Sequence, residues 1–197
     1  MSRRLILFAP GAGAPSTSPW MRRWTNHLAG LGRVVPFDYP YVLAGRKSPD
    51  RLPKLIAAHQ QALAQASRRS DDVKVLIGKS MGSRVGCHVA ADEPDILALV
   101  CLGYPLRGSS GVIRDEALLA LQSPILFVQG SHDVLCPLGD LERVRKKMSA
   151  ESSVYVVDGG NHSLEVGQRQ LREDRMTQAE VESRALEAIR VFLKRWA

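Results

Sequence analysis

The stretch Val75-Leu76-Ile77-Gly78-Lys79-Ser80-Met81-Gly82 decides how the rest of this chain is interpreted. An apolar run of strand type leads directly into a Gly-x-Ser-x-Gly turn, and a helix-like stretch follows. This order is typical of a nucleophile elbow, a strained strand-to-helix turn that exposes a serine hydroxyl above a sheet. Glycines suit both ends of such a turn, because the helix passes close to the strand and leaves little room for side chains. The pentapeptide also arises by chance, so its meaning depends on the surrounding sequence.

The composition is that of an ordinary globular chain. It has 197 residues, of which 45% are hydrophobic and 24% charged, and this predicts one domain over residues 1–197. No apolar run approaches the roughly 20 residues that a membrane span needs, so we expect no membrane partner. The three cysteines (Cys87, Cys101, Cys136) show no disulfide framework and predict a reducing, cytoplasmic location. The sequence makes no prediction about oligomeric state.

A net charge of +7 raises the question of nucleic-acid binding. The basic residues are scattered in short pairs, such as Arg22-Arg23 and Lys194-Arg195, and several fall at the ends of predicted helices. Cations at those positions complement the helix dipole and remain solvated. The aromatic residues, 6% of the chain, do not interleave with the basic pairs as a stacking platform would. We therefore predict a solvated basic surface and no nucleic-acid partner.

Strand-like and helix-like stretches alternate along the chain. Strands are expected at residues 5–9, 34–37, 73–77, 97–102, 125–129 and 153–157. Helices are expected at about residues 19–31, 53–67, 83–91, 138–148 and 179–196. This alternation predicts an α/β fold with a mainly parallel sheet and helices on both faces. In such sheets, ligands bind beyond the carboxyl ends of the strands, so catalytic partners of Ser80 should also follow strands.

Two loops meet this condition. The strand at 125–129 is followed by Gly130-Ser131-His132-Asp133, and the strand that ends at residue 157 is followed by Asp158-Gly159-Gly160-Asn161-His162. The chain order is therefore serine, acid, histidine, with each residue at the carboxyl end of its own strand.

In this order and spacing the chain resembles the alpha/beta-hydrolase superfamily over nearly its full length. More closely, it resembles a small, capless group that includes testis-expressed protein 30-like and dienelactone-hydrolase-like hydrolases. The stretches Leu102-Gly103-Tyr104-Pro105-Leu106 and 38–51 carry the closer resemblance. The resemblance implies an alpha/beta-hydrolase fold without a cap domain.

A role for each residue follows from chemistry. Ser80 is the predicted nucleophile, and His162 is the predicted base, because neutral imidazole is available near physiological pH. Asp133 is expected to orient the imidazole and stabilise its cation. The backbone N–H groups of Met81 and Ala12 are expected to form the oxyanion hole.

Other residues compete for these roles. His132 is a rival base, but neighbouring residues seldom face each other, and this disfavours its pairing with Asp133. Asp158 is a rival acid, although a role in orienting the His162 loop is the stronger expectation. Cys136 is expected to be a small buried residue. Packing or solvent exposure is the ordinary explanation for the three histidines on predicted helices, His27, His59 and His88.

No cofactor is predicted. The histidines and cysteines lack metal-ligand spacing, with no CxxC and no HExxH. Gly11-Ala12-Gly13 lacks the third glycine of a dinucleotide-binding loop, and no Walker lysine follows it at the required offset.

With no cap, the loops 38–51 and 103–114 are expected to cover the site. Lys79, beside the nucleophile, either favours anionic substrates or points to solvent. The candidate substrate contacts are Tyr39, Tyr41, Arg46, Lys79 and Tyr104. An open site suits a small or protruding ester.

The sequence thus predicts a serine hydrolase that cleaves a small-molecule carboxylic ester or thioester through an acyl-enzyme. One alternative is a catalytically idle interaction module of the same fold, because some relatives of the suggested subgroup serve in chromatin-modifying complexes. Another is a cofactor-free peroxidase that uses the same three residues.

Overall fold

The computed structural model describes residues 4–67, 72–108 and 110–197, and all elements below lie in these ranges. Six strands form one sheet in the order β2-β1-β3-β4-β5-β6, and every neighbouring pair is parallel. The strands are β1 (Arg4–Ala9), β2 (Arg33–Pro36), β3 (Val73–Lys79), β4 (Ile96–Leu102), β5 (Ile125–Gly130) and β6 (Ser152–Val157). All six predicted strands are confirmed, with ends that differ by one or two residues.

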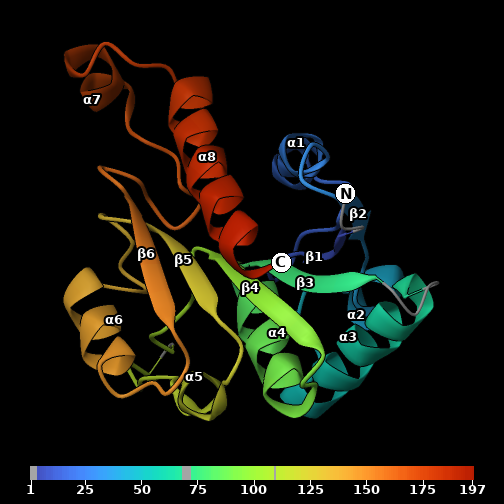
Figure 1. Cartoon of the computed structure of the whole chain (residues 1–197). Coiled ribbons are helices and arrows are strands. Elements are labelled where there is room, and N and C mark those ends of the chain that lie inside the picture. Colours follow the sequence, from blue (N-terminus) through green and yellow to red (C-terminus); the bar gives the residue numbers. More distant parts are fainter. Residues whose placement is uncertain (1–3, 68–71, 109) are drawn as a thin grey trace.

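Helices cover both faces of the sheet, as the alternation of elements predicts. They are α1 (Pro19–Leu28), α2 (Pro40–Leu43), α3 (Leu52–Ala66), α4 (Met81–Asp92), α5 (Glu116–Ala120), α6 (Leu138–Arg145), α7 (Gln168–Glu173) and α8 (Gln178–Trp196). Helices α1 and α8 lie on one face, and α3, α4 and α6 lie on the other (Figure 1). The predicted doubly covered parallel sheet is therefore confirmed.

Strand β1 shows how one apolar run serves two cores. Leu5 and Leu7 pack in the cluster that contains α3 and α4, whereas Ile6 and Phe8 pack in the cluster that contains α1 and α8. Successive side chains of a strand point to opposite faces, so a strand with helices on both sides must be apolar at every position. All four side chains are fully buried.

Three short helices, α2, α5 and α7, were not predicted. They contain four, five and six residues, which is too short to show a helical period in the sequence. Helix α2 lies inside the segment from Asp38 to Asp50 that was expected to be a loop.

Parallel pairing brings the carboxyl ends of the strands together at one edge. Ala9 at the end of β1 is the pairing partner of Gly78 in β3, and Lys79 is the partner of Leu102 in β4. The loops that follow β1, β3 and β4 therefore start side by side. In the described residues no separate cap domain covers this edge.

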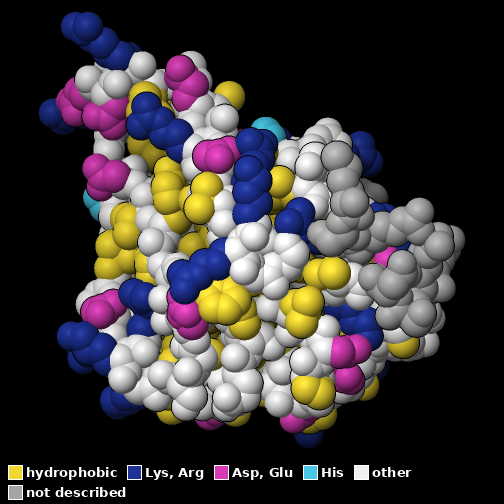
Figure 2. Space-filling view, in the orientation of Figure 1, with side chains coloured by type: hydrophobic (Ala, Val, Ile, Leu, Met, Phe, Trp, Pro, Cys, Tyr) yellow, Lys and Arg dark blue, Asp and Glu magenta, His cyan; other side chains and the backbone are white. Residues whose placement is uncertain are grey.

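One face of the molecule carries its charges in a dispersed pattern. On the face shown in Figure 2, Lys and Arg side chains are spread over many positions, with Asp and Glu among them. None of the described helices is long and apolar enough to cross a membrane.

Candidate active site

The turn between β3 and α4 has the backbone of a nucleophile elbow. Ser80 has φ of 50° and ψ of −115°, a left-handed conformation that costs a residue with a side chain about 1–3 kcal/mol. Its N–H donates to the carbonyl of Leu102 at 3.1 Å, which ties the turn to β4. A Cβ atom on Gly78 would lie 2.3 Å from the backbone nitrogen of Ser83, so only glycine lets helix and strand approach this closely.

The structure brings Ser80, Asp133 and His162 together in one hydrogen-bonded chain. The Oγ atom of Ser80 lies 2.7 Å from Nε2 of His162, and Nδ1 of His162 lies 2.7 Å from Oδ2 of Asp133. Because a carboxylate only accepts hydrogen bonds, Nδ1 carries the proton and Nε2 is free to accept one from the serine. This is the arrangement that activates a serine hydroxyl.

Asp133 is held in its charged form by its partners. Burial by itself would raise its pKa, but the hydrogen bond from His162, the N–H of Leu135 at 2.9 Å and the side-chain amide of Gln129 together hold the pKa of this carboxyl below its usual range. Sequence reasoning missed Gln129, which sits among the apolar residues of β5. A glutamine in an otherwise apolar, fully buried strand is the signal that could have revealed it.

The two backbone amides that the sequence predicts for an oxyanion hole belong to residues beside Ser80, Met81 and Ala12. The N–H of Met81 is the first of α4, and the leading amides of a helix have no partner within it. The loop after β1 lies against Ser80, since a Cβ on Gly11 would be 3.5 Å from Cβ of Ser80. The next glycine, Gly13, donates its N–H to the hydroxyl of Tyr41 at 3.1 Å, and Ala12 between them lines the cavity beside Ser80.

A cavity of about 420 Å³ opens above the serine. Its apolar walls come from Trp20 and Met21 of α1 and from Leu135, and its polar lining includes Ser163 and Glu165. No described residue of the segments 38–51 or 103–114 lines it, so the expectation that these loops cover the site was wrong. Helix α1 takes that place, because α1 packs against the sheet face beside the end of β1.

Three of the predicted substrate contacts lie in the core instead. Tyr39, Tyr41 and Tyr104 are fully buried. The hydroxyl of Tyr39 is 3.1 Å from Nδ1 of His59, and that of Tyr104 donates to the carbonyl of Arg114 at 3.1 Å. Each tyrosine therefore stabilises the loops from within, and direct contact with a substrate is excluded by burial.

Arg46 also lies away from the cavity. Its guanidinium forms an exposed ion pair with Asp50 at 2.8 Å, and it is not among the residues that line the space above Ser80.

Lys79 is the one predicted substrate contact among the described residues that lines the cavity beside Ser80, and it does not point to solvent. Its side chain is buried, its ammonium donates a hydrogen bond to the carbonyl of His162, and it lies 5.2 Å from the centroid of the Trp20 ring. Burial is the main reason that its pKa falls to about 8.

The rival residues have other partners. His132 is exposed, and its backbone N–H donates to the carbonyl of Gly160. Asp158 is exposed and accepts from the Ser131 hydroxyl at 3.1 Å, within the loop that leads to His162. Cys136 is buried, and burial raises the pKa of its thiol to about 12. In the described ranges, no cluster of three or more His, Cys, Asp or Glu is arranged to hold a metal ion.

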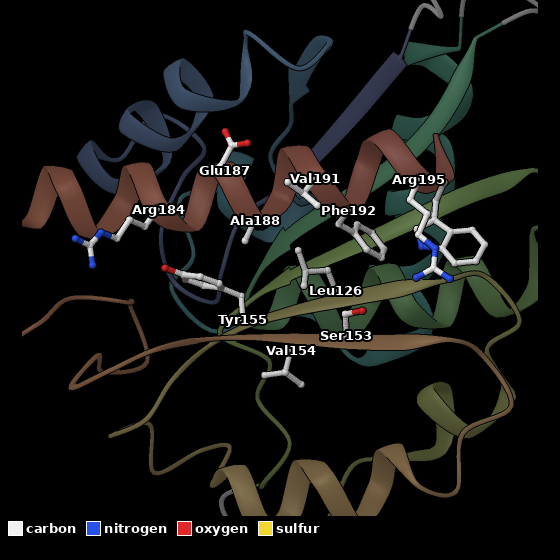
Figure 3. Close-up of a pocket in the computed structure, with 11 residues that line it drawn as sticks. Leu126, Ser153, Val154, Tyr155, Arg184, Glu187, Ala188, Val191, Phe192 and Arg195 are labelled. Atoms are coloured by element: carbon white, nitrogen blue, oxygen red, sulfur yellow. The ribbon is translucent and has the colours of Figure 1, made fainter.

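A second cavity shares no lining residue with the one above Ser80. It has about 560 Å³ and runs between β6 and α8, with Tyr155 of the strand and Ala188 and Phe192 of the helix among its lining residues (Figure 3). It contains neither Ser80 nor His162, so the smaller cavity is the candidate active site although this one is larger.

Comparison with known proteins agrees with the fold. The sequence profile of an alpha/beta hydrolase domain family matches residues 2–194. An alpha-beta serine hydrolase homologue from Coxiella burnetii is 22% identical, with 88% of this chain and 83% of that chain covered and a TM-score of 0.69. Dienelactone hydrolase from Anabaena variabilis is 18% identical, with 99% and 85% covered and a TM-score of 0.69. The thioesterase of the prodiginine biosynthetic pathway in Streptomyces coelicolor is 17% identical, with 95% and 89% covered and a TM-score of 0.68. At these identities the solved structures show the fold alone, and the closer similarity to testis-expressed protein 30-like hydrolases stays a prediction.

Proposed function

The chain belongs to the alpha/beta hydrolase domain family, and from this premise we propose that it is a serine hydrolase that cleaves a carboxylic ester or thioester. The observation that carries the proposal is the unbroken chain of hydrogen bonds from Asp133 through His162 to Ser80, with both links at 2.7 Å. Nothing in the packing of an α/β sheet requires these three side chains to meet at the carboxyl edge of the strands.

In the first half of the reaction, Nε2 of His162 takes the hydroxyl proton of Ser80 as Oγ attacks the substrate carbonyl carbon. Asp133 stabilises the imidazolium that forms, without taking its proton. The negative charge that develops on the carbonyl oxygen is stabilised by the N–H groups of Met81 and Ala12. The C–O or C–S bond then breaks, and the imidazolium gives its proton to the departing alkoxide or thiolate.

In the second half, water replaces the leaving group. His162 removes a proton from the water as its oxygen attacks the acyl-enzyme carbonyl, and collapse of the second tetrahedral intermediate returns the proton to Ser80. The products are a carboxylic acid and an alcohol or thiol, and no cofactor takes part.

The cavity supports a small-molecule substrate. A volume of about 420 Å³ with walls from Trp20, Met21 and Leu135 suits a short, largely apolar acyl or alcohol portion. The three cysteines are free and buried, which supports action in a reducing compartment such as the cytoplasm.

A fluorophosphonate probe tests the proposal, because it reacts covalently with an activated serine. Wild-type protein should be labelled at Ser80, and Ser80→Ala should lose the labelling completely. His162→Ala should label at least about 10³-fold more slowly, because the triad acts as a unit. His132→Ala is the matched control and should label at the wild-type rate.

Two results would contradict the proposal. One is the absence of labelling and of p-nitrophenyl acetate turnover in wild-type protein while a control esterase reacts, which would favour the idle interaction module. The other is labelling that survives in Ser80→Ala, which would place the nucleophile elsewhere.

A further inference from the structure

Lys79, the residue before Ser80, contacts the backbone of His162. Lys79 ends β3, next to Ser80, and its ammonium donates a hydrogen bond to the backbone carbonyl of His162. That carbonyl is enclosed from a second side by Gly103, where a Cβ atom would lie 2.5 Å from the His162 oxygen. The His162 carbonyl is therefore held between β3 and the loop after β4.

Trp20 holds the next carbonyl along the same loop. Its indole Nε1–H donates to the carbonyl of Ser163 at 3.0 Å, and its ring lies 5.2 Å from the Lys79 ammonium. The cation is attracted to the face of the ring, so the lysine and the tryptophan fix one another as well as the loop. Two consecutive carbonyls of the His162 loop are thus bound by one lysine–tryptophan pair.

This arrangement places a positive charge where burial imposes a desolvation penalty on it. Lys79 is only 8% exposed, and in the described part of the chain it forms no ion pair within 4.0 Å. Asp133 and Glu165 are the carboxylates whose charges oppose the effect of burial on its pKa. A methionine would occupy similar volume without the desolvation penalty of an ammonium. Packing alone therefore gives no reason for a lysine here.

We infer that Lys79 and Trp20 are positioning residues, which hold the His162 loop so that the imidazole stays between Ser80 and Asp133. The inference rests on the proposed serine-hydrolase function. It goes beyond that function because it gives Lys79, the residue before the nucleophile, the role of positioning the base His162. A charge-assisted hydrogen bond to a carbonyl is shorter and stronger than a neutral one, and this makes the ammonium suited to the task. Displacement of a catalytic group by about 1 Å reduces rates by as much as about 10²-fold.

The test measures the rate of labelling of Ser80 by a small, uncharged fluorophosphonate. An uncharged probe reports activation of the serine and is insensitive to any attraction between Lys79 and a charged substrate. Lys79→Met should label about 10- to 100-fold more slowly than wild type. Lys74→Met is the matched control, because Lys74 lies on the same strand but forms an ion pair with Asp95. This variant should be labelled at the wild-type rate.

The pH dependence adds a readout that a purely structural lysine would not move. The groups that face the Lys79 ammonium are Asp133, Glu165 and His162. As the pH rises through about 8, the ammonium loses its proton, and its hydrogen bond to the His162 carbonyl weakens. Wild-type labelling should therefore fall on the alkaline side, whereas Lys79→Met should be slow throughout and show no such fall. Lys79→Arg, which keeps its charge, should regain part of the rate at about pH 9.

Trp20→Phe provides a second variant in case Lys79→Met does not fold. It removes the indole donor to the Ser163 carbonyl, keeps an aromatic ring, and should label about 3- to 10-fold more slowly. Wild-type rates for both Lys79→Met and Trp20→Phe at every pH, with wild-type protein itself labelled, would overturn the inference and leave the proposed function standing. Failure of wild-type protein to label would instead overturn the proposed function.

Discussion

Gln129 donates a hydrogen bond from its side-chain amide to the carboxylate of Asp133, and both side chains are buried. The other end of the same amide accepts the backbone N–H of Tyr104 at 3.0 Å. Because that N–H can only donate, the oxygen of Gln129 must face Tyr104 and its NH₂ group must face the aspartate. Gln129 and His162 thus bind the same carboxylate oxygen of Asp133, Oδ2, while the N–H of Leu135 binds Oδ1.

We predict that Gln129→Glu lowers activity more than its small change in size suggests. The new carboxylate can still accept from Tyr104, but it faces Asp133 with a like charge, so one of the two groups must take up a proton. Labelling of Ser80 by a fluorophosphonate should slow by at least about 10-fold near neutral pH. Gln170→Glu is the control, because half-buried Gln170 also faces an aspartate, the exposed Asp158, and this substitution should leave the rate unchanged.

Tyr41→Phe tests the support of the loop after β1, which carries the proposed oxyanion-hole N–H of Ala12. The Tyr41 hydroxyl accepts the N–H of Gly13, one residue beyond Ala12, so its loss should loosen the loop and lower kcat about 3- to 10-fold with little change in KM. Tyr39→Phe is the matched control, since the Tyr39 hydroxyl bonds to His59 rather than to this loop. It should lower the melting temperature and leave kcat unchanged. Equal effects on kcat would contradict the role given to Tyr41.

Gly82→Ala should damage the site through the backbone. A Cβ atom at residue 82 would lie 2.6 Å from the carbonyl oxygens of both Ala9 and Pro10, so the loop after β1 must move. We expect a lower melting temperature and a loss of esterase activity of at least about 10-fold. Gly139→Ala should melt at the same or a slightly higher temperature, because nothing lies within 4 Å of its Cβ position and it is helical in α6. Wild-type activity in Gly82→Ala would show that the loop adapts.

His59 should make the stability of the fold depend on pH. Burial lowers its pKa to about 3, and its Nε2 has no hydrogen-bond partner among the described residues. In the unfolded chain His59 therefore binds a proton as the pH falls through about 6.5, whereas in the folded chain it does so only at a far lower pH. The stability due to neutral His59 is complete above about pH 6.5 and is lost as the pH falls toward 3.

Urea unfolding at about pH 7 and about pH 4.5 measures this effect. His59 should account for a loss of roughly 2–3 kcal/mol of unfolding free energy between the two conditions. His59→Gln should be less stable near neutral pH but should show a pH dependence flatter by that amount. Exposed His132→Gln should keep the wild-type dependence. Equal pH dependence in wild type and His59→Gln would refute the prediction.

The sequence was informative wherever a residue type has one local consequence. Alternating apolar and amphipathic stretches determined the six strands and the long helices, because burial on both faces requires continuous apolar runs. The Gly-Lys-Ser-Met-Gly turn determined the elbow, since strain at Ser80 and the close approach at Gly78 need those residue types. Placement at the ends of strands was enough to select Asp133 and His162, whose side chains the structure brings to Ser80.

Only the tertiary structure decided which side chains surround Ser80, Asp133 and His162. Tyr39, Tyr41 and Tyr104 look like surface contacts in the sequence, yet they pack inward because the loops that carry them fold over the core. Part of the cavity wall comes from α1, and the partner of Lys79 is a carbonyl distant in the chain. Local sequence sets backbone conformation through sterics and burial, whereas the direction and partner of a polar side chain depend on groups that are distant in sequence and meet only after folding.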